Sequence, residues 1–162
     1  MSAPRRTPVV TNIHRGAFVT EASPRSERWT HLDLDSARLG VRVEILEPGE
    51  HSSYHHWHTQ EEEHVLVLEG TVTLVLGPED AREELELGSG DHVCFHAGDE
   101  TAHHLENRSD APARFLVFGE RLASDVVVYP DHQVMMVKAM DFAQFTYRPL
   151  ERSTASADED ER

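Results

Sequence analysis

The chain has 162 residues, with 30 acidic and 15 basic side chains and a formal net charge of −15. This length suits one domain with a sizeable core, and the acidity disfavours nucleic acid or an anionic membrane surface as a partner, because both require a basic surface. The sequence has neither a long apolar run nor an apolar signal segment near its start, so we expect a cytoplasmic protein that is not embedded in a membrane. The single cysteine, Cys94, excludes a disulfide within the chain.

Three parts are expected along the chain. Residues 1–12 are rich in Pro, Arg and Thr, which predicts an N-terminal arm, and residues 13–150 form the single domain. Residues 151–162 consist of Ser, Ala, Thr and charged residues without an apolar anchor, so they predict a disordered acidic tail.

Short apolar runs separated by turn residues occupy the domain. In 39–46, Val41 and Val43 alternate with Arg42 and Glu44, and we interpret the valine face as the inner one, with Arg42 pointing outward. The predicted strands are 29–35, 39–46, 64–68, 71–76, 82–87, 92–95, 103–106, 114–118 and 126–129. Eight or more strands without a long helical period predict an all-β sandwich or small barrel.

Two segments need separate comment, one for its secondary structure and one for its apolar faces. The segment 134–147 fits either a strand pair or a short helix. The run 64–68 is apolar on both faces, so a second sheet or a second subunit must cover it. For this reason, and because the edges of the barrel need cover, we expect a homodimer.

Nine of the twelve histidines lie between His51 and His104. Residues two apart in a strand point to the same face, so His56 and His58 would present two imidazoles side by side. Glu63 lies five residues beyond His58, so a carboxylate can return to the imidazoles only if the chain turns or breaks its pleat between them.

The spacing H-x-H-x4-E-x6-G, which ends at Gly70, resembles the first motif of the cupin superfamily. A second stretch, GDHVCFHAGDETAHHLEN, resembles the second cupin motif, with His103 as fourth ligand and Asn107 as closing residue. The resemblance covers about residues 40–119 and looks most like the small bacterial single-domain cupins of the conserved-barrel type. It implies a jelly-roll barrel, also called a double-stranded β-helix.

The resemblance also implies a metal site made by His56, His58, Glu63 and His103. Three neutral imidazoles and one carboxylate suit one divalent transition metal, such as Fe, Mn, Zn or Ni. The ligand types do not choose among these ions.

The choice of the two histidines depends on where the count starts. Counted from Gly49, the family spacing would place the ligands at His55 and Trp57, and tryptophan cannot coordinate a metal. Counted backwards from the glutamate and the later glycine, it places them at His56 and His58, which we adopt because the ligands must agree with one another.

Two further choices rest on strand phase. Glu63 shares a strand face with Val65, part of the expected interior, so we prefer it to Glu62. His103 is in phase with Leu105, so we prefer it to His104.

The chain also departs from the family pattern. His96 stands where the second motif usually has proline, and four residues rather than two separate Gly98 from His103. An enzyme would need a general base near the metal, and the candidates for this catalytic role are His96 and Tyr54, both also explicable as surface residues.

A divalent ion in a pocket lined mainly by Val, Leu and Phe could hold a small oxygen-bearing organic substrate. The resemblance implies a metal-dependent enzyme of the dioxygenase or the isomerase/lyase type. The alternatives are a non-catalytic cupin that binds a metal or a small molecule, and a structural dimer that binds metal only incidentally.

Overall fold

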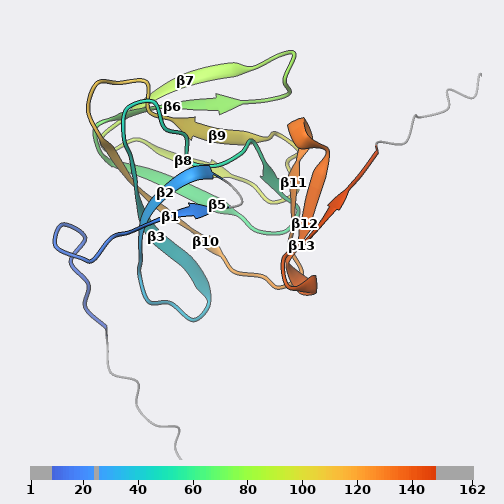
Figure 1. The fold of residues 1–162 in the computed structure, drawn as a ribbon, viewed down its shortest axis with the longest axis horizontal. Helices are drawn as coiled ribbons and strands as arrows, with labels where there is room; N and C mark the ends of the chain where they lie inside the picture. The colour runs from blue at the N-terminus through green and yellow to red at the C-terminus, as the bar shows by residue number, and fades with distance from the viewer. Residues whose placement is uncertain (1–8, 24–25, 149–162) are drawn as a thin grey trace, which may run out of the picture.

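The computed structural model describes residues 9–23 and 26–148, and strands dominate this part of the chain (Figure 1). The strands are β1 (Val19–Ser23), β2 (Ser26–Asp33), β3 (Leu39–Leu46), β4 (Trp57–His58), β5 (Glu63–Glu69), β6 (Thr71–Leu76), β7 (Glu83–Gly88), β8 (His92–Phe95), β9 (His103–Glu106), β10 (Ala113–Glu120), β11 (Val126–Tyr129), β12 (Val134–Val137) and β13 (Ala143–Thr146). Two 3-10 turns, η1 (Pro130–His132) and η2 (Lys138–Met140), flank β12. No helix in the described residues is long and apolar enough to cross a membrane.

Two antiparallel sheets enclose the main core. One has six strands in the order β1-β2-β3-β10-β5-β8, and the other has three in the order β7-β6-β9. Alternate residues of each sheet point inward, so Val67 and Phe115 from the first sheet meet Leu74 and Leu105 from the second. The prediction of an all-β jelly roll is therefore confirmed.

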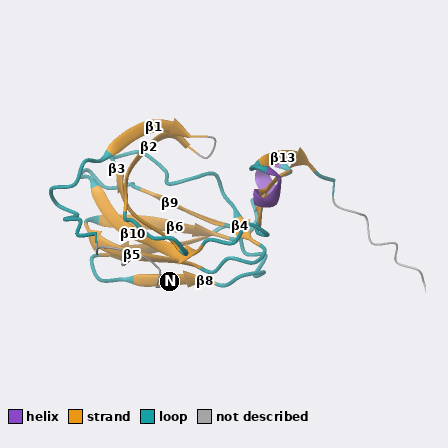
Figure 2. Ribbon diagram, turned by 90° about the horizontal axis from the view of Figure 1, so that it is seen from below, coloured by secondary structure: helices purple, strands orange, loops and turns teal. Residues whose placement is uncertain are grey.

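A third sheet extends from one end of this sandwich (Figure 2). Its order is β13-β12-β11-β4, so the short strand β4 joins the C-terminal strands to the histidine-rich segment. Val127, Tyr129 and Met136 form a small core of their own within this sheet. The segment 134–147 is thus the strand pair β12 and β13 with the turn η2 between them, and not a helix.

Asn107 closes the barrel beside the first motif. Its side chain is fully buried, and its amide nitrogen donates to the carbonyl oxygens of Leu46 and Ala111, both at 2.8 Å. The main-chain carbonyl oxygen of Asn107 accepts from Gly49 N at 2.8 Å. Gly49 has a φ of +85°, which favours glycine at this turn.

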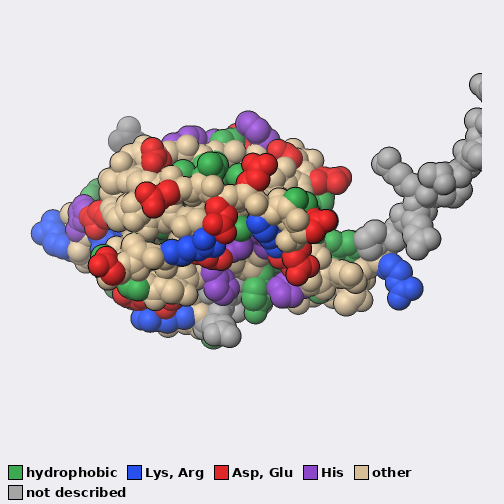
Figure 3. Space-filling model, turned by 90° about the horizontal axis from the view of Figure 1, so that it is seen from above, with side chains coloured by type: hydrophobic (Ala, Val, Ile, Leu, Met, Phe, Trp, Pro, Cys, Tyr) green, Lys and Arg blue, Asp and Glu red, His purple; other side chains and the backbone are tan. Residues whose placement is uncertain are grey.

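The predicted strands agree with the observed ones to within a few residues, but β1 and the two-residue strand β4 have no counterpart among them. The predicted acidic tail lies outside the described residues, so it and the domain limits stay predictions. The same holds for the homodimer. Acidic side chains are spread over the face shown in Figure 3, with basic ones among them.

Candidate metal centre

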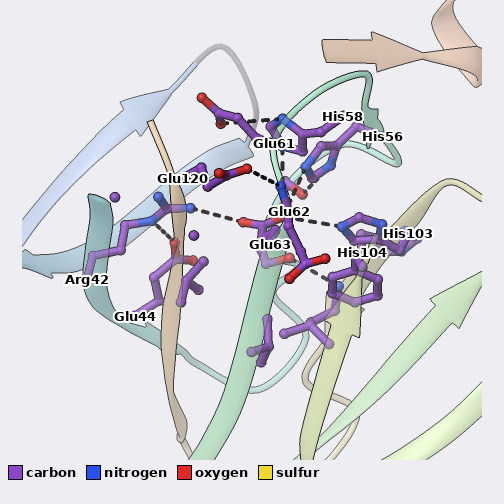
Figure 4. Close-up of a pocket in the computed structure, with 18 of the residues that line it drawn as sticks. Arg42, Glu44, His56, His58, Glu61, Glu62, Glu63, His103, His104 and Glu120 are labelled. Carbon is purple, nitrogen blue, oxygen red and sulfur yellow. Dashed lines mark hydrogen bonds and ion pairs between the residues drawn. The ribbon is translucent and has the colours of Figure 1, made fainter. Parts of the chain in front are cut away.

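Three histidines and one glutamate converge at the end of the barrel where β4 and β5 meet (Figure 4). The Nε2 atoms of His103, His56 and His58 lie 3.3, 3.7 and 3.9 Å from Glu63 Oε2. Ligand atoms of His56, His58 and Glu63 all lie within 4.8 Å of one another. Nitrogen and carboxylate donors at these separations could hold one metal ion between them.

The backbone explains how residues distant in sequence reach this point. β4 ends at His58 and pairs with β11, so the chain leaves its strand before β5 begins at Glu63. His103 on β9 is bridged to His56, whose N–H donates to its carbonyl oxygen at 3.1 Å. The reverse bond, from His103 N to His56 O, is 2.8 Å long, and the His103 ring stacks on Phe95 at 3.5 Å between centroids.

Strand β10 lies very close to the start of β5, where Glu63 points into the barrel. Gly119 is the residue directly opposite Glu63, and a Cβ on this glycine would overlap the carbonyl oxygen of Glu62. A residue with a side chain would therefore push β10 away from the strand that carries the carboxylate.

His56 is oriented by the backbone. Its Nδ1 lies 2.9 Å from the carbonyl oxygen of Tyr54, which can only accept, so Nδ1 carries the proton and Nε2 presents its lone pair toward Glu63. Burial lowers the pKa of His56 to about 4, which keeps the imidazole neutral near pH 7. Burial alone would raise the pKa of Glu63, but its contacts with the surrounding imidazoles, first among them the hydrogen bond with His103 Nε2 at 3.3 Å, outweigh burial and hold that pKa well below its ordinary value.

His58 is oriented by Asp125, whose side chain is fully buried. Its Nδ1 lies 2.7 Å from Asp125 Oδ2, and Asp125 Oδ1 accepts from Gln60 N at 3.0 Å and from Thr59 Oγ1 at 3.3 Å. Burial would raise the pKa of Asp125, but the hydrogen bond with His58, the amide of Gln60 and the ammonium of Lys138 together lower it. The aspartate is therefore ionised and holds the His58 ring with Nε2 toward Glu63.

Lys138 and Glu61 complete the layer behind His58. Lys138 Nζ contacts Asp125 Oδ2 at 3.1 Å and also donates to Glu61, whose other carboxylate oxygen accepts from Leu122 N at 2.5 Å. Sequence analysis missed Asp125, Glu61 and Lys138. The aspartate and lysine lie more than 60 residues beyond the histidine that they support, and no local spacing marks them.

Arg42 and Glu44 also face this centre, so the prediction that Arg42 points outward is wrong. On β10 the residues opposite them are Val117 and Phe115, both in the core, and directly paired residues share a face. Arg42 Nη2 lies 3.8 Å from Glu63 Oε1, and its Nε donates to Glu44. The arginine thus bridges two carboxylates inside the barrel.

These groups line a cavity of about 310 Å³. Its wall includes apolar residues such as Val65 and Phe115, as expected, but it also has a charged side. The charged residues in the wall include Arg42, Glu44, Glu61, Arg121 and Lys138. The cavity is therefore more polar than the sequence indicated, which favours a ligand with several oxygens.

The chain was also compared with known protein families and solved structures. The family model described as "Cupin domain" matches residues 42–119. A crystal structure from Silicibacter pomeroyi, described as a sugar phosphate isomerase from a cupin superfamily, is 30% identical with a TM-score of 0.72. The match covers 89% of this chain and 98% of that one. The chain belongs to the cupin superfamily.

Two other solved structures resemble this cupin. One, from Acidithiobacillus ferrooxidans, is described as a candidate sugar phosphate isomerase; it is 26% identical over 88% of this chain and 96% of that one, with a TM-score of 0.75. A Cupin 2 conserved barrel domain protein from Salinispora arenicola is 18% identical over 73% and 92%, with a TM-score of 0.54, and shows the fold alone. A comparison with curated proteins gave no match.

The alternative ligands weighed in the sequence make other contacts, although His104 and Glu62 also line the cavity. His55 Nδ1 contacts His104 Nδ1 at 2.8 Å, and His104 Nε2 contacts Glu106 at 2.9 Å, so these two imidazoles contact each other outside the cluster. The carboxylate of Glu62, the residue just before β5, contacts His96 and His64 rather than the three imidazoles.

The two predicted acid/base residues are not among the residues that line the cavity. The His96 side chain is 72% exposed and contacts Glu62 at 3.0 Å. Tyr54 is 36% exposed and packs edge-on against His132 at 4.7 Å. Their catalytic roles stay predictions, and neither reaches the centre in this conformation.

Proposed function

We propose that this cupin is a metal-dependent isomerase of small sugar phosphates. The observation that carries the proposal is the convergence of three imidazoles and Glu63 on a cavity with a charged wall. The two cupins described as sugar phosphate isomerases, which match nearly their whole length, support the same reaction class. A substrate rich in hydroxyl groups suits the polar wall better than an apolar one.

The proposed ligands are His56, His58, Glu63 and His103, and they fit a divalent transition metal. The neutral His56 offers a lone pair, the ionised Glu63 offers charge, and two of the rings are held by a carbonyl oxygen and a carboxylate. When bound, Fe, Mn, Zn or Ni would act as a Lewis acid on the substrate oxygens.

The other residues of the wall supply binding and proton transfer. Arg121, an exposed cation, would bind the phosphate, and Arg42 would hold a substrate oxygen while it orients Glu44. Glu44 would remove the proton from the carbon beside the carbonyl and return it to the former carbonyl carbon. The proton and the carbonyl change places along the chain, so the isomerisation needs no external oxidant.

The test uses full-length protein loaded with each metal in turn and a panel of aldose and ketose phosphates in heavy water. Interconversion with incorporation of deuterium at the carbon is expected. Glu44→Gln should lower kcat by about 10²–10⁴-fold with metal content unchanged, whereas the exposed Glu84→Gln serves as the matched control. Oxygen uptake that depends on substrate, without interconversion, would replace the isomerase by a dioxygenase. No turnover with any metal or substrate would leave a binding protein.

A further inference from the structure

A second group of metal-binding side chains lies on the outer face of β5 and β8. His64 pairs with Cys94 in the ladder and Glu63 pairs with Phe95, so the residues on either side of Phe95 point away from the barrel. We propose that Glu62, Cys94 and His96 bind a zinc ion there, at a site separate from the centre inside the barrel.

The ligand atoms are already close together. His96 Nδ1 lies 3.0 Å from Glu62 Oε2 and 3.6 Å from Cys94 Sγ, and ligand atoms of all three residues lie within 4.8 Å of one another. Sulfur, imidazole nitrogen and carboxylate oxygen are the donors that zinc takes in proteins. Three protein ligands leave one of the four tetrahedral positions for water or another small ligand.

The carboxylate between these ligands is held from its other side. Glu62 Oε1 lies 3.2 Å from His64 Nε2, and the His64 ring stacks on Phe118 with centroids 4.8 Å apart and planes 5° from parallel. His64 Nδ1 in turn lies 3.1 Å from His92 Nε2. Glu62 is therefore oriented by a packed imidazole that need not itself bind the ion.

An ion can reach this group from solvent. The side chains of His96 and Glu62 are 72% and 43% exposed, and Cys94 is half-buried at the edge strand β8. The site shares no ligand with the centre inside the barrel, so neither needs the other. They lie back to back, because Phe95, between Cys94 and His96, stacks on His103.

The test exploits the single cysteine of the chain. Full-length protein, stripped of metal and kept reduced without oxygen, is titrated with Co²⁺. A thiolate bound to Co²⁺ absorbs in the near ultraviolet through charge transfer, and here only Cys94 can produce that band. We expect the band to saturate at one equivalent and to disappear when Zn²⁺ displaces Co²⁺. Cys94→Ser and His96→Ala should abolish it, whereas His92→Gln, on the same strand face, should keep it.

The amount of bound metal separates the two sites. We expect the native chain to bind two equivalents of Co²⁺ and Cys94→Ser to bind one. If the native chain binds only one equivalent and shows the thiolate band, the outer site is supported and the inner site is not. No band from folded native protein, or a band that survives His96→Ala, would overturn the outer site. Half an equivalent accompanied by dimerisation would also overturn it, because the ion would then bridge two chains.

Discussion

Replacing Asp125 by asparagine tests whether the layer behind His58 controls the metal centre. Asparagine has nearly the same shape, so His58 Nδ1, 2.7 Å away in the native protein, keeps a neutral acceptor but loses its anionic one. Lys138 keeps Glu61 as its only carboxylate partner among these groups. The substitution therefore removes one charge from a buried network and little volume.

Two magnitudes follow from this geometry. Loss of a carboxylate that orients a metal-bound histidine typically weakens metal binding by about 10–100-fold. Loss of one partner from a buried ion pair costs about 3–5 kcal/mol, and we expect the lower end because Glu61 still pairs with Lys138. A loss of about 3 kcal/mol would lower Tm by roughly 6–12 °C in a domain of this size.

Metal affinity is measured by competition with a chelator, and the stability of the metal-free protein by urea denaturation. Asp110→Asn, at an exposed position, is the matched control and should change neither. If Asp125→Asn lowers stability but binds metal as tightly as the native chain, the aspartate supports the fold and does not orient His58 for coordination.

Three further predictions concern pH, ligand charge and strand approach. Burial lowers the pKa of both His55 and His56 from 6.5 to about 4, so the unfolded chain binds more protons between these values. The free energy of unfolding of the metal-free protein should therefore be highest above pH 6.5 and should fall by about 2–3 kcal/mol per histidine as the pH drops toward 4. Urea titrations at several pH values measure this change. Stability that does not change over this range would contradict the burial of neutral rings. Glu63→Gln, made in the Cys94→Ser chain so that only the inner centre is counted, should abolish stoichiometric metal in elemental analysis while circular dichroism shows a folded chain. Retention of a full equivalent in this double variant would remove Glu63 from the ligands. Gly119→Ala should cost about 1–3 kcal/mol in the same urea assay, because its Cβ meets the backbone of Glu62, and an unchanged midpoint would refute that close approach.

Much of this fold could be predicted because the alternation of side chains in a strand and the spacing of a motif depend only on residues close in sequence. The alternation of residues 39–46 predicted the strand β3 with its observed limits, and the two motifs together predicted the convergence of His56 and Glu63 with His103. Alternation cannot tell which face is interior when the interior holds charges, so Arg42 was assigned to the wrong side. Asp125 reaches His58 only through the pairing of β4 with β11, and this long-range contact leaves no local pattern.

The charges buried at the centre give an independent reason for a divalent ion. Among the described residues there, four carboxylates and two cations have side chains less than a quarter exposed: Glu44, Glu61, Glu63, Asp125, Arg42 and Lys138. The pKa of His56 is too low for its imidazole to add positive charge near pH 7. Arg42 and Lys138 can pair with two of these four carboxylates, and the other two have only imidazoles beside them. A buried charge without a full partner is costly. A divalent metal between the three imidazoles and Glu63 would balance the remaining carboxylate charge, so removing the metal should destabilise the fold as well as end the proposed isomerase activity.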